Sequence, residues 1–85
     1  MTFEGALIKE QGVEFAIVIV KPHVLQNRLE ANQSISAFRR RFGVPVVLMA
    51  QNHQGVPTYY GRKDIVRFLA NIPLEAVPWS RFTLS

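Results

Sequence analysis

Two segments of the chain are apolar at nearly every position. The first covers residues 13–21, and its apolar side chains alternate between the two faces of a strand (Phe15, Ile17 and Ile19 against Ala16, Val18 and Val20). The second is the stretch "VPVVLMAQ" that follows Gly43. Strands that are apolar on both faces are covered on both sides, so we expect both segments at the centre of a sheet.

Between these strands the apolar period changes to that of a helix. In "VLQNRLEANQSISAFRRRFG", side chains three and four residues apart form one stripe, with Asn32 as its polar exception (Leu25, Leu29, Ile35, Phe38 and Phe42). Gly43 is placed to cap the C-terminus of this helix, and Pro45 prevents its continuation. A second helix is expected in "DIVRFLANI", which begins at Asp64 or a neighbour and is closed by Pro73.

Two further strands flank the central pair. Gln11 and Gly12 supply a turn that joins residues 13–21 to an earlier strand in "FEGALIKE", and "NHQG" joins "VPVVLMAQ" to "VPTYYG". Pro57 cannot donate to a strand ladder, so the last strand is expected at an edge. The order ββαββα predicts an α/β (α+β) fold with a single mixed four-stranded sheet and two helices. The two central strands should run parallel through a right-handed crossover.

The 85 residues predict a single domain, 1–85, whose tail, residues 73–85, is irregular and packs on the body. The tail holds Trp79 and Phe82, aromatic residues of the kind that often anchor protein interfaces. Pairing with a second copy would also cover the exposed edge strand, which otherwise invites aggregation. These features favour a homodimer.

The net charge of +4 is unevenly distributed along the chain. Residues 1–21 carry two bases and three acids, residues 22–67 carry seven bases and two acids, and the remainder is balanced. The positive charge of the middle segment can attract a polyanion.

Two basic clusters lie in that segment. Arg39, Arg40 and Arg41 are consecutive, so in a helix they cannot form one face, and they are interpreted as complementing the helix C-terminus. Arg62 and Lys63 stand instead at the start of a helix, where the dipole favours acids. Either a bound anion or a pairing with Asp64 would offset that cost.

Tyr59 and Tyr60 precede these bases on alternate faces of their strand, and Arg67 follows them. One exposed ring beside Arg62, Lys63 and Arg67 is the minimum for stacking single-stranded nucleic acid between phosphate contacts. The alternative is a plain junction between a strand and a helix.

Other chemistry finds little support in the sequence. The chain has no cysteine, which excludes disulfides and cysteine-ligated zinc, and favours a reducing, cytoplasmic location. His23 and His53 lack the spacing of a metal site, and no serine lies in a GxSxG context. We therefore expect no cofactor, no catalytic residues and no resident metal.

The N-terminus does not have the pattern of a signal peptide, and no apolar run approaches the roughly 20 residues that cross a bilayer.

The stretch "FEGALIKEQGVEFAIVIVKP", followed by a helix and an apolar strand, resembles the core of the PD-(D/E)xK restriction-endonuclease-like family. The resemblance implies a metal-binding acid at Glu4 and a catalytic lysine at Lys21. Ile19 stands where that family has its second acid, so the resemblance implies a degenerate, inactive member. "FGVPVVLMAQNHQG" more faintly resembles the C-terminal half of a thioredoxin fold without its CxxC.

The sequence thus predicts a small non-enzymatic domain that acts as a homo-oligomeric protein-interaction module. A nucleic-acid-binding module that uses the last junction between strand and helix is the alternative. A metal-dependent nuclease ranks third.

Overall fold

The computed structural model describes residues 1–10 and 12–83. In this part of the chain five strands form one mixed sheet in the order β4-β3-β2-β1-β5. The strands are β1 (Thr2–Glu10), β2 (Val13–Ile19), β3 (Val46–Gln51), β4 (Pro57–Tyr60) and β5 (Ser80–Thr83). The helices are α1 (Pro22–Gln26), α2 (Arg28–Phe42) and α3 (Lys63–Leu69), and a 3₁₀ turn, η1, covers Leu74–Ala76. The mixed α/β class expected from the sequence is confirmed.

The centre of the sheet agrees with the apolar pattern. β2 and β3 are parallel neighbours, and the chain between them forms α1 and α2. β4 lies at one edge, as Pro57 predicts, and pairs antiparallel with β3. β1 pairs antiparallel with β2 across a turn in which Gly12 takes a positive φ of 81°. Gln11, the other residue of the predicted turn, lies outside the described residues.

Two element counts from the sequence are wrong. The sheet has a fifth strand, β5, which pairs antiparallel with β1 inside the tail that was expected to be irregular. The single long helix is two helices, because Asn27 takes an extended conformation (φ −118°, ψ 107°) and its Oδ1 accepts a hydrogen bond from the Glu30 N–H at 3.1 Å. Asn27 therefore caps α2 and ends α1 at the same point.

The break at Asn27 changes which side chains face the sheet. Leu29, which the continuous stripe placed on the core side, is 67% exposed, whereas Ala31 and Phe38 are buried. At the other end of α2, Gly43 takes the left-handed conformation (φ 73°) and its N–H donates to the Arg39 carbonyl, as predicted for a C-terminal cap.

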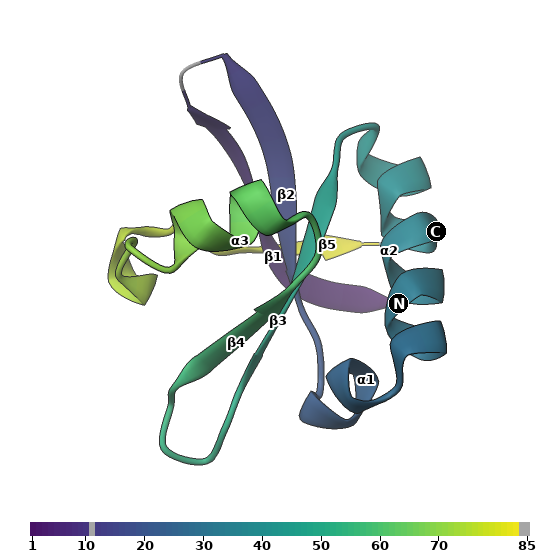
Figure 1. Ribbon diagram of the computed structural model, residues 1–85. Coiled ribbons are helices and arrows are strands. Elements are labelled where there is room, and N and C mark those ends of the chain that lie inside the picture. Colours follow the sequence, from purple (N-terminus) through teal and green to yellow (C-terminus); the bar gives the residue numbers. More distant parts are fainter. Residues whose placement is uncertain (11, 84–85) are drawn as a thin grey trace.

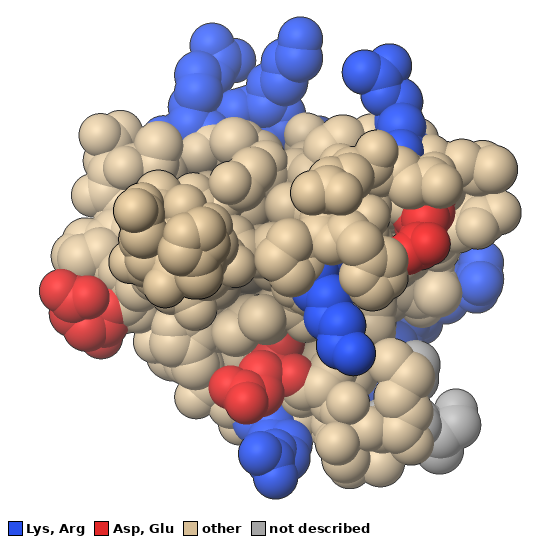
Figure 2. Space-filling model, turned by 90° about the horizontal axis from the view of Figure 1, so that it is seen from below, with Lys and Arg blue, Asp and Glu red and all other residues tan. Residues whose placement is uncertain are grey.

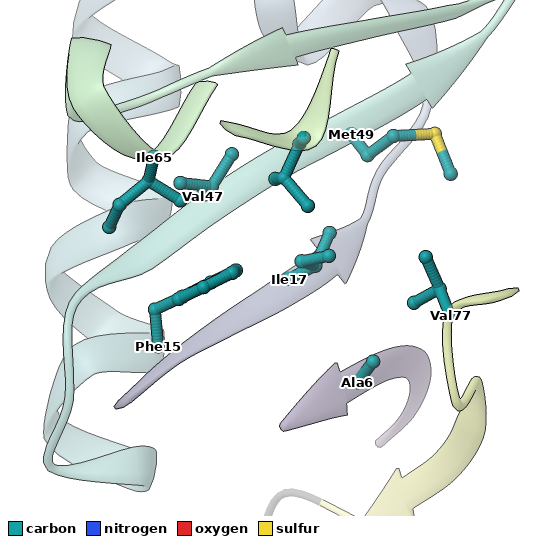
Figure 3. Close-up of a cluster of buried hydrophobic side chains, with 8 residues drawn as sticks. Ala6, Phe15, Ile17, Val47, Met49, Ile65 and Val77 are labelled. Atoms are coloured by element: carbon teal, nitrogen blue, oxygen red, sulfur yellow. The ribbon is translucent and has the colours of Figure 1, made fainter. Parts of the chain in front are cut away.

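The sheet separates two apolar clusters, and each is covered by helix (Figure 1). We call the side covered by α3 and η1 the α3 face, and Figure 3 shows its aliphatic core between strands and helix, with Phe15 at one end. The side covered by α1 and α2 is the α2 face. Its cluster is rich in aromatic rings, with Phe3 4.8 Å from Phe38 and 5.6 Å from Phe82 between ring centroids. Both clusters contain side chains with no solvent exposure, which makes the sheet a true middle layer.

Candidate nucleic-acid interface

A groove of about 550 Å³ lies on the α2 face, between α2 and the segment that leaves β4. One wall comes from α2 and the other from the end of β4 and the start of α3, while Pro45 and Val46, at the start of β3, also line the groove. The antiparallel pairing of Leu48 with Tyr60 brings the start of β3 beside the end of β4. The lining residues are Arg28, Asn32, Ile35, Arg39, Pro45, Val46, Tyr60, Gly61, Arg62 and Lys63.

Four of these lining residues are basic and none is acidic. Arg28 and Arg39 stand on the α2 wall, and Arg62 and Lys63 stand on the opposite wall. Figure 2 shows several Lys and Arg side chains along the upper edge of the molecule and others at separate places on the same view. A concave surface lined by one sign of charge concentrates the field of those charges and attracts counter-ions.

Spacing along α2 explains why bases from distant positions meet at one groove. Arg28, Asn32, Ile35 and Arg39 follow one another at intervals of four, three and four residues, which places them on one side of a helix. Arg40 and Arg41 point elsewhere, and the Arg41 guanidinium lies 5.6 Å from the centroid of the Phe42 ring. The sequence analysis predicted that the three consecutive arginines do not share one face of the helix, and the structure agrees. Arg39 is the one of the three that lines the groove.

The two tyrosines separate onto opposite faces of the sheet. Tyr60 lines the groove, and its hydroxyl donates to Asn32 Oδ1 at 3.0 Å, which ties β4 to α2. Tyr59 packs against the α3-face core, and burial raises the pKa of its hydroxyl. Its hydroxyl oxygen has no hydrogen-bond partner among the described residues. Tyr60 is thus the ring that stands beside Arg62 and Lys63.

The bases at the start of α3 have different environments. Arg62 forms a two-pronged ion pair with Asp64, at 3.0 Å from Nε and 2.6 Å from the terminal nitrogen. This pair holds the pKa of the Asp64 carboxyl below its usual range and raises that of Arg62. Of the two ways to accommodate Arg62 that the sequence left open, the structure contains the pairing with Asp64.

The remaining bases of the groove have no such partner. Arg28, Arg39 and Lys63 make no ion pair with any acid in the described part of the chain. Arg67 lies outside the groove, and its Nε donates to the Lys63 carbonyl at 3.4 Å. Of the five residues proposed from the sequence, the structure brings together Tyr60, Arg62 and Lys63.

Gly61 allows the second wall to lie close to the sheet. A Cβ at this position would stand 3.0 Å from Val47 Cγ2 and 3.2 Å from its Cα, closer than side chains normally pack. A larger residue would require its neighbours to shift by a few tenths of an ångström, at a backbone φ of 157° that L side chains rarely adopt. Gly61 therefore allows this segment to approach β3 closely at Val47, a residue of the α3-face core.

The proposed interface residues of the tail pack within their own chain. Trp79 Nε1–H donates to the Leu74 carbonyl at 3.0 Å. Phe82 stacks on Phe3, and it meets Phe42 edge-on with 5.2 Å between the centroids of the Phe42 and Phe82 rings. Both side chains are half-buried by these contacts.

Of the three positions named by the endonuclease-like resemblance, Glu4 and Ile19 lie together and Lys21 lies apart from them. Glu4 and Ile19 line one depression of about 510 Å³ with Gln51 and Arg81, so an isoleucine stands beside the one acid. Lys21 lies at the start of α1 and does not line it. Within residues 1–10 and 12–83 no group of three or more His, Asp or Glu is placed to hold a metal ion.

No family model matches the chain, and it has no significant match among curated proteins or solved structures. No helix of the described residues is long and apolar enough to cross a membrane.

Proposed function

We propose that the protein binds nucleic acid through the groove between α2 and the β4–α3 junction. The observation that supports this proposal most is that four basic side chains stand on two facing walls of the groove, with no acidic residue in the lining. Three of the four lack an acidic partner among the described residues, so their charge is free to neutralise phosphates. Phosphate contacts release counter-ions and give most of the affinity in sequence-independent binding.

The salt dependence of binding gives a quantitative expectation. Four phosphate contacts predict a slope of log K against log salt of about −3 to −4, at roughly 0.7 to 0.9 per phosphate. Fluorescence anisotropy of a labelled oligonucleotide, titrated at several salt concentrations, measures this slope. Binding that does not weaken with salt would contradict the proposal.

A matched pair of variants separates the groove from net charge alone. Arg39→Glu and Arg40→Glu change the net charge equally and lie at neighbouring positions, but only Arg39 lines the groove. Arg39→Glu should weaken binding at least tenfold at low salt and reduce the slope by about one, whereas Arg40→Glu should have a much smaller effect. Equal losses in the two variants would mean that the protein attracts nucleic acid only through its overall charge.

Homodimer formation is the second candidate, and the open edges of the sheet favour it. β4 and β5 lie at the two edges, and no strand of the described residues pairs with the outer side of either. An unpaired edge can add a strand from a second copy. Light scattering at high micromolar concentration tests this, and a strict monomer would refute it.

A further inference from the structure

The lining of the groove divides by exposure into a floor and a rim. The basic residues and Asn32 are all exposed and form the rim. The remaining residues are half-buried or buried and form the floor (Ile35, Pro45, Val46, Tyr60 and Gly61). The groove therefore presents an apolar floor with an aromatic ring between two rows of positive charge.

The α2 wall has the length of several nucleotides. Arg28 and Arg39 are 11 residues apart on one side of α2, and a rise of 1.5 Å per residue separates them by about 16 Å along the helix. A stacked strand advances 3.4 Å per phosphate, so this wall spans about five phosphates, and fewer of an extended strand. A ligand that contacts both arginines is therefore a polymer rather than a single phosphate group.

A double helix does not match the division into floor and rim. Its phosphates lie on the outside and its bases are stacked inside, so it offers no apolar surface to a floor that lies between two basic walls. A single strand exposes the faces of its nucleobases, which can stack on aromatic and apolar side chains. Its phosphates can meanwhile contact the Arg and Lys side chains at the groove edge.

We infer that the ligand of this groove is single-stranded nucleic acid, which lies along α2 with its bases on the floor and its phosphates at the rim. This inference rests on the proposed function. It adds to that function the strandedness of the ligand, its direction along the helix and the role of Tyr60 as a stacking platform.

Three probes of equal charge test the inference by anisotropy and competition: a labelled single-stranded 12-mer, a duplex with the same number of phosphates, and inorganic polyphosphate. The single strand should bind at least tenfold more tightly than either of the other two. If the duplex or polyphosphate binds equally well in an Arg39-dependent manner, the groove binds polyanions but the strandedness assigned here is wrong. If none binds, or if Arg39→Glu changes nothing, the proposed function itself fails.

Variants at Tyr60 test the floor separately from the rim. Tyr60→Phe keeps the ring and loses only the hydrogen bond to Asn32, so it should retain single-strand binding. Tyr60→Leu removes the ring and should weaken single-strand binding about fivefold or more, with little effect on polyphosphate. Equal affinities of the Phe and Leu variants, both folded by circular dichroism, would overturn the stacking role.

A length series provides a readout that does not depend on variants. Affinity for single strands should rise steeply up to about five nucleotides, the length of the α2 wall, and then only slowly. Beyond that point affinity should grow only with the number of registers available on the strand, so a constant multiplicative gain for each added nucleotide would contradict a strand confined to this groove.

Discussion

Both faces of the sheet carry a buried apolar core, but the surfaces beside the two cores differ. On the α2 face the uncovered region beside β4 is lined by four bases and no acid. On the α3 face the corresponding hollow, of about 160 Å³, is lined by apolar side chains with Glu10 and Asp64, and Val13 and Phe68 remain 46% and 39% exposed. The fold thus gathers four basic side chains from α2 and the β4–α3 junction around one groove, whereas the lining of the hollow on the α3 face is apolar and acidic.

This difference shows why charge along the chain is a poor guide to the binding surface. The most basic run, Arg39 to Arg41, contributes one residue to the groove, while Arg28 joins it from 11 residues away. The arrangement depends on which side of α2 faces β4, because that side alone lies beside Arg62 and Lys63.

The largest expected effect is on the free energy of unfolding, and it tests whether both cores stabilise the fold. Ile17 on the α3 face and Leu48 on the α2 face are both fully buried. Truncation of either to alanine should lower the free energy of unfolding by about 2–5 kcal/mol. Denaturant titration measures the loss, and Leu29→Ala, at a position 67% exposed, is the control that should change little. A loss on one face only would show that the sheet has a single core.

A smaller effect is expected where the tail joins the α3 face. Trp79→Phe keeps an aromatic ring and removes the donor to the Leu74 carbonyl, so it should cost about 0.5–1.5 kcal/mol. Thermal unfolding at two protein concentrations measures it. A loss that appears only at high concentration would mean that Trp79 packs between two chains instead of within one.

A modest effect on binding is expected at the ion pair beside the groove. Asp64→Asn frees Arg62 from its carboxylate partner and should tighten single-strand binding severalfold at low salt. Glu75→Gln removes the same charge from η1, outside the groove, and is the matched control. Equal gains in both variants would assign the effect to net charge.

The smallest effect is the dependence of stability on pH that this pair introduces. Because Arg62 lowers the pKa of Asp64, the pair stabilises the folded state above the unfolded carboxyl pKa of about 3.9. That contribution is lost as pH falls through the lower folded pKa. The difference in melting temperature between the parent and Asp64→Asn should therefore be small at neutral pH and disappear in strong acid. A difference that grows on acidification would contradict the pair.

The fold was predictable where a local pattern decides it. The apolar runs of β2 and β3 predicted the central parallel pair, Pro57 predicted an edge position for β4, and Gly43 predicted the end of α2. The break at Asn27 was missed because the apolar spacing continues across it, although an asparagine three residues before Glu30 is a capping signal. β5 was missed because "SRFT" is short and has no alternating pattern, and it forms only because β1 offers it an edge.

The candidate site was predictable only in part. The strand-to-helix junction at Tyr60, Arg62 and Lys63 stands out in the sequence, because bases are unusual at a helix start. The α2 wall does not, since Arg28 and Arg39 are separated along the chain. The spacing of Arg28, Asn32, Ile35 and Arg39 would have indicated one helical side, but only the packing of α2 beside β4 makes that side a groove wall.

Chemical-shift mapping of the ¹⁵N-labelled protein with a short single-stranded oligonucleotide tests the central claim most directly. The largest shifts should fall on the groove side of α2, from Arg28 to Arg39, and on residues 60–63, with the α3 face unaffected. Shifts concentrated around Val13 and Phe68, or spread evenly over all basic residues including Arg40 and Arg67, would contradict the assignment of this groove as the binding site.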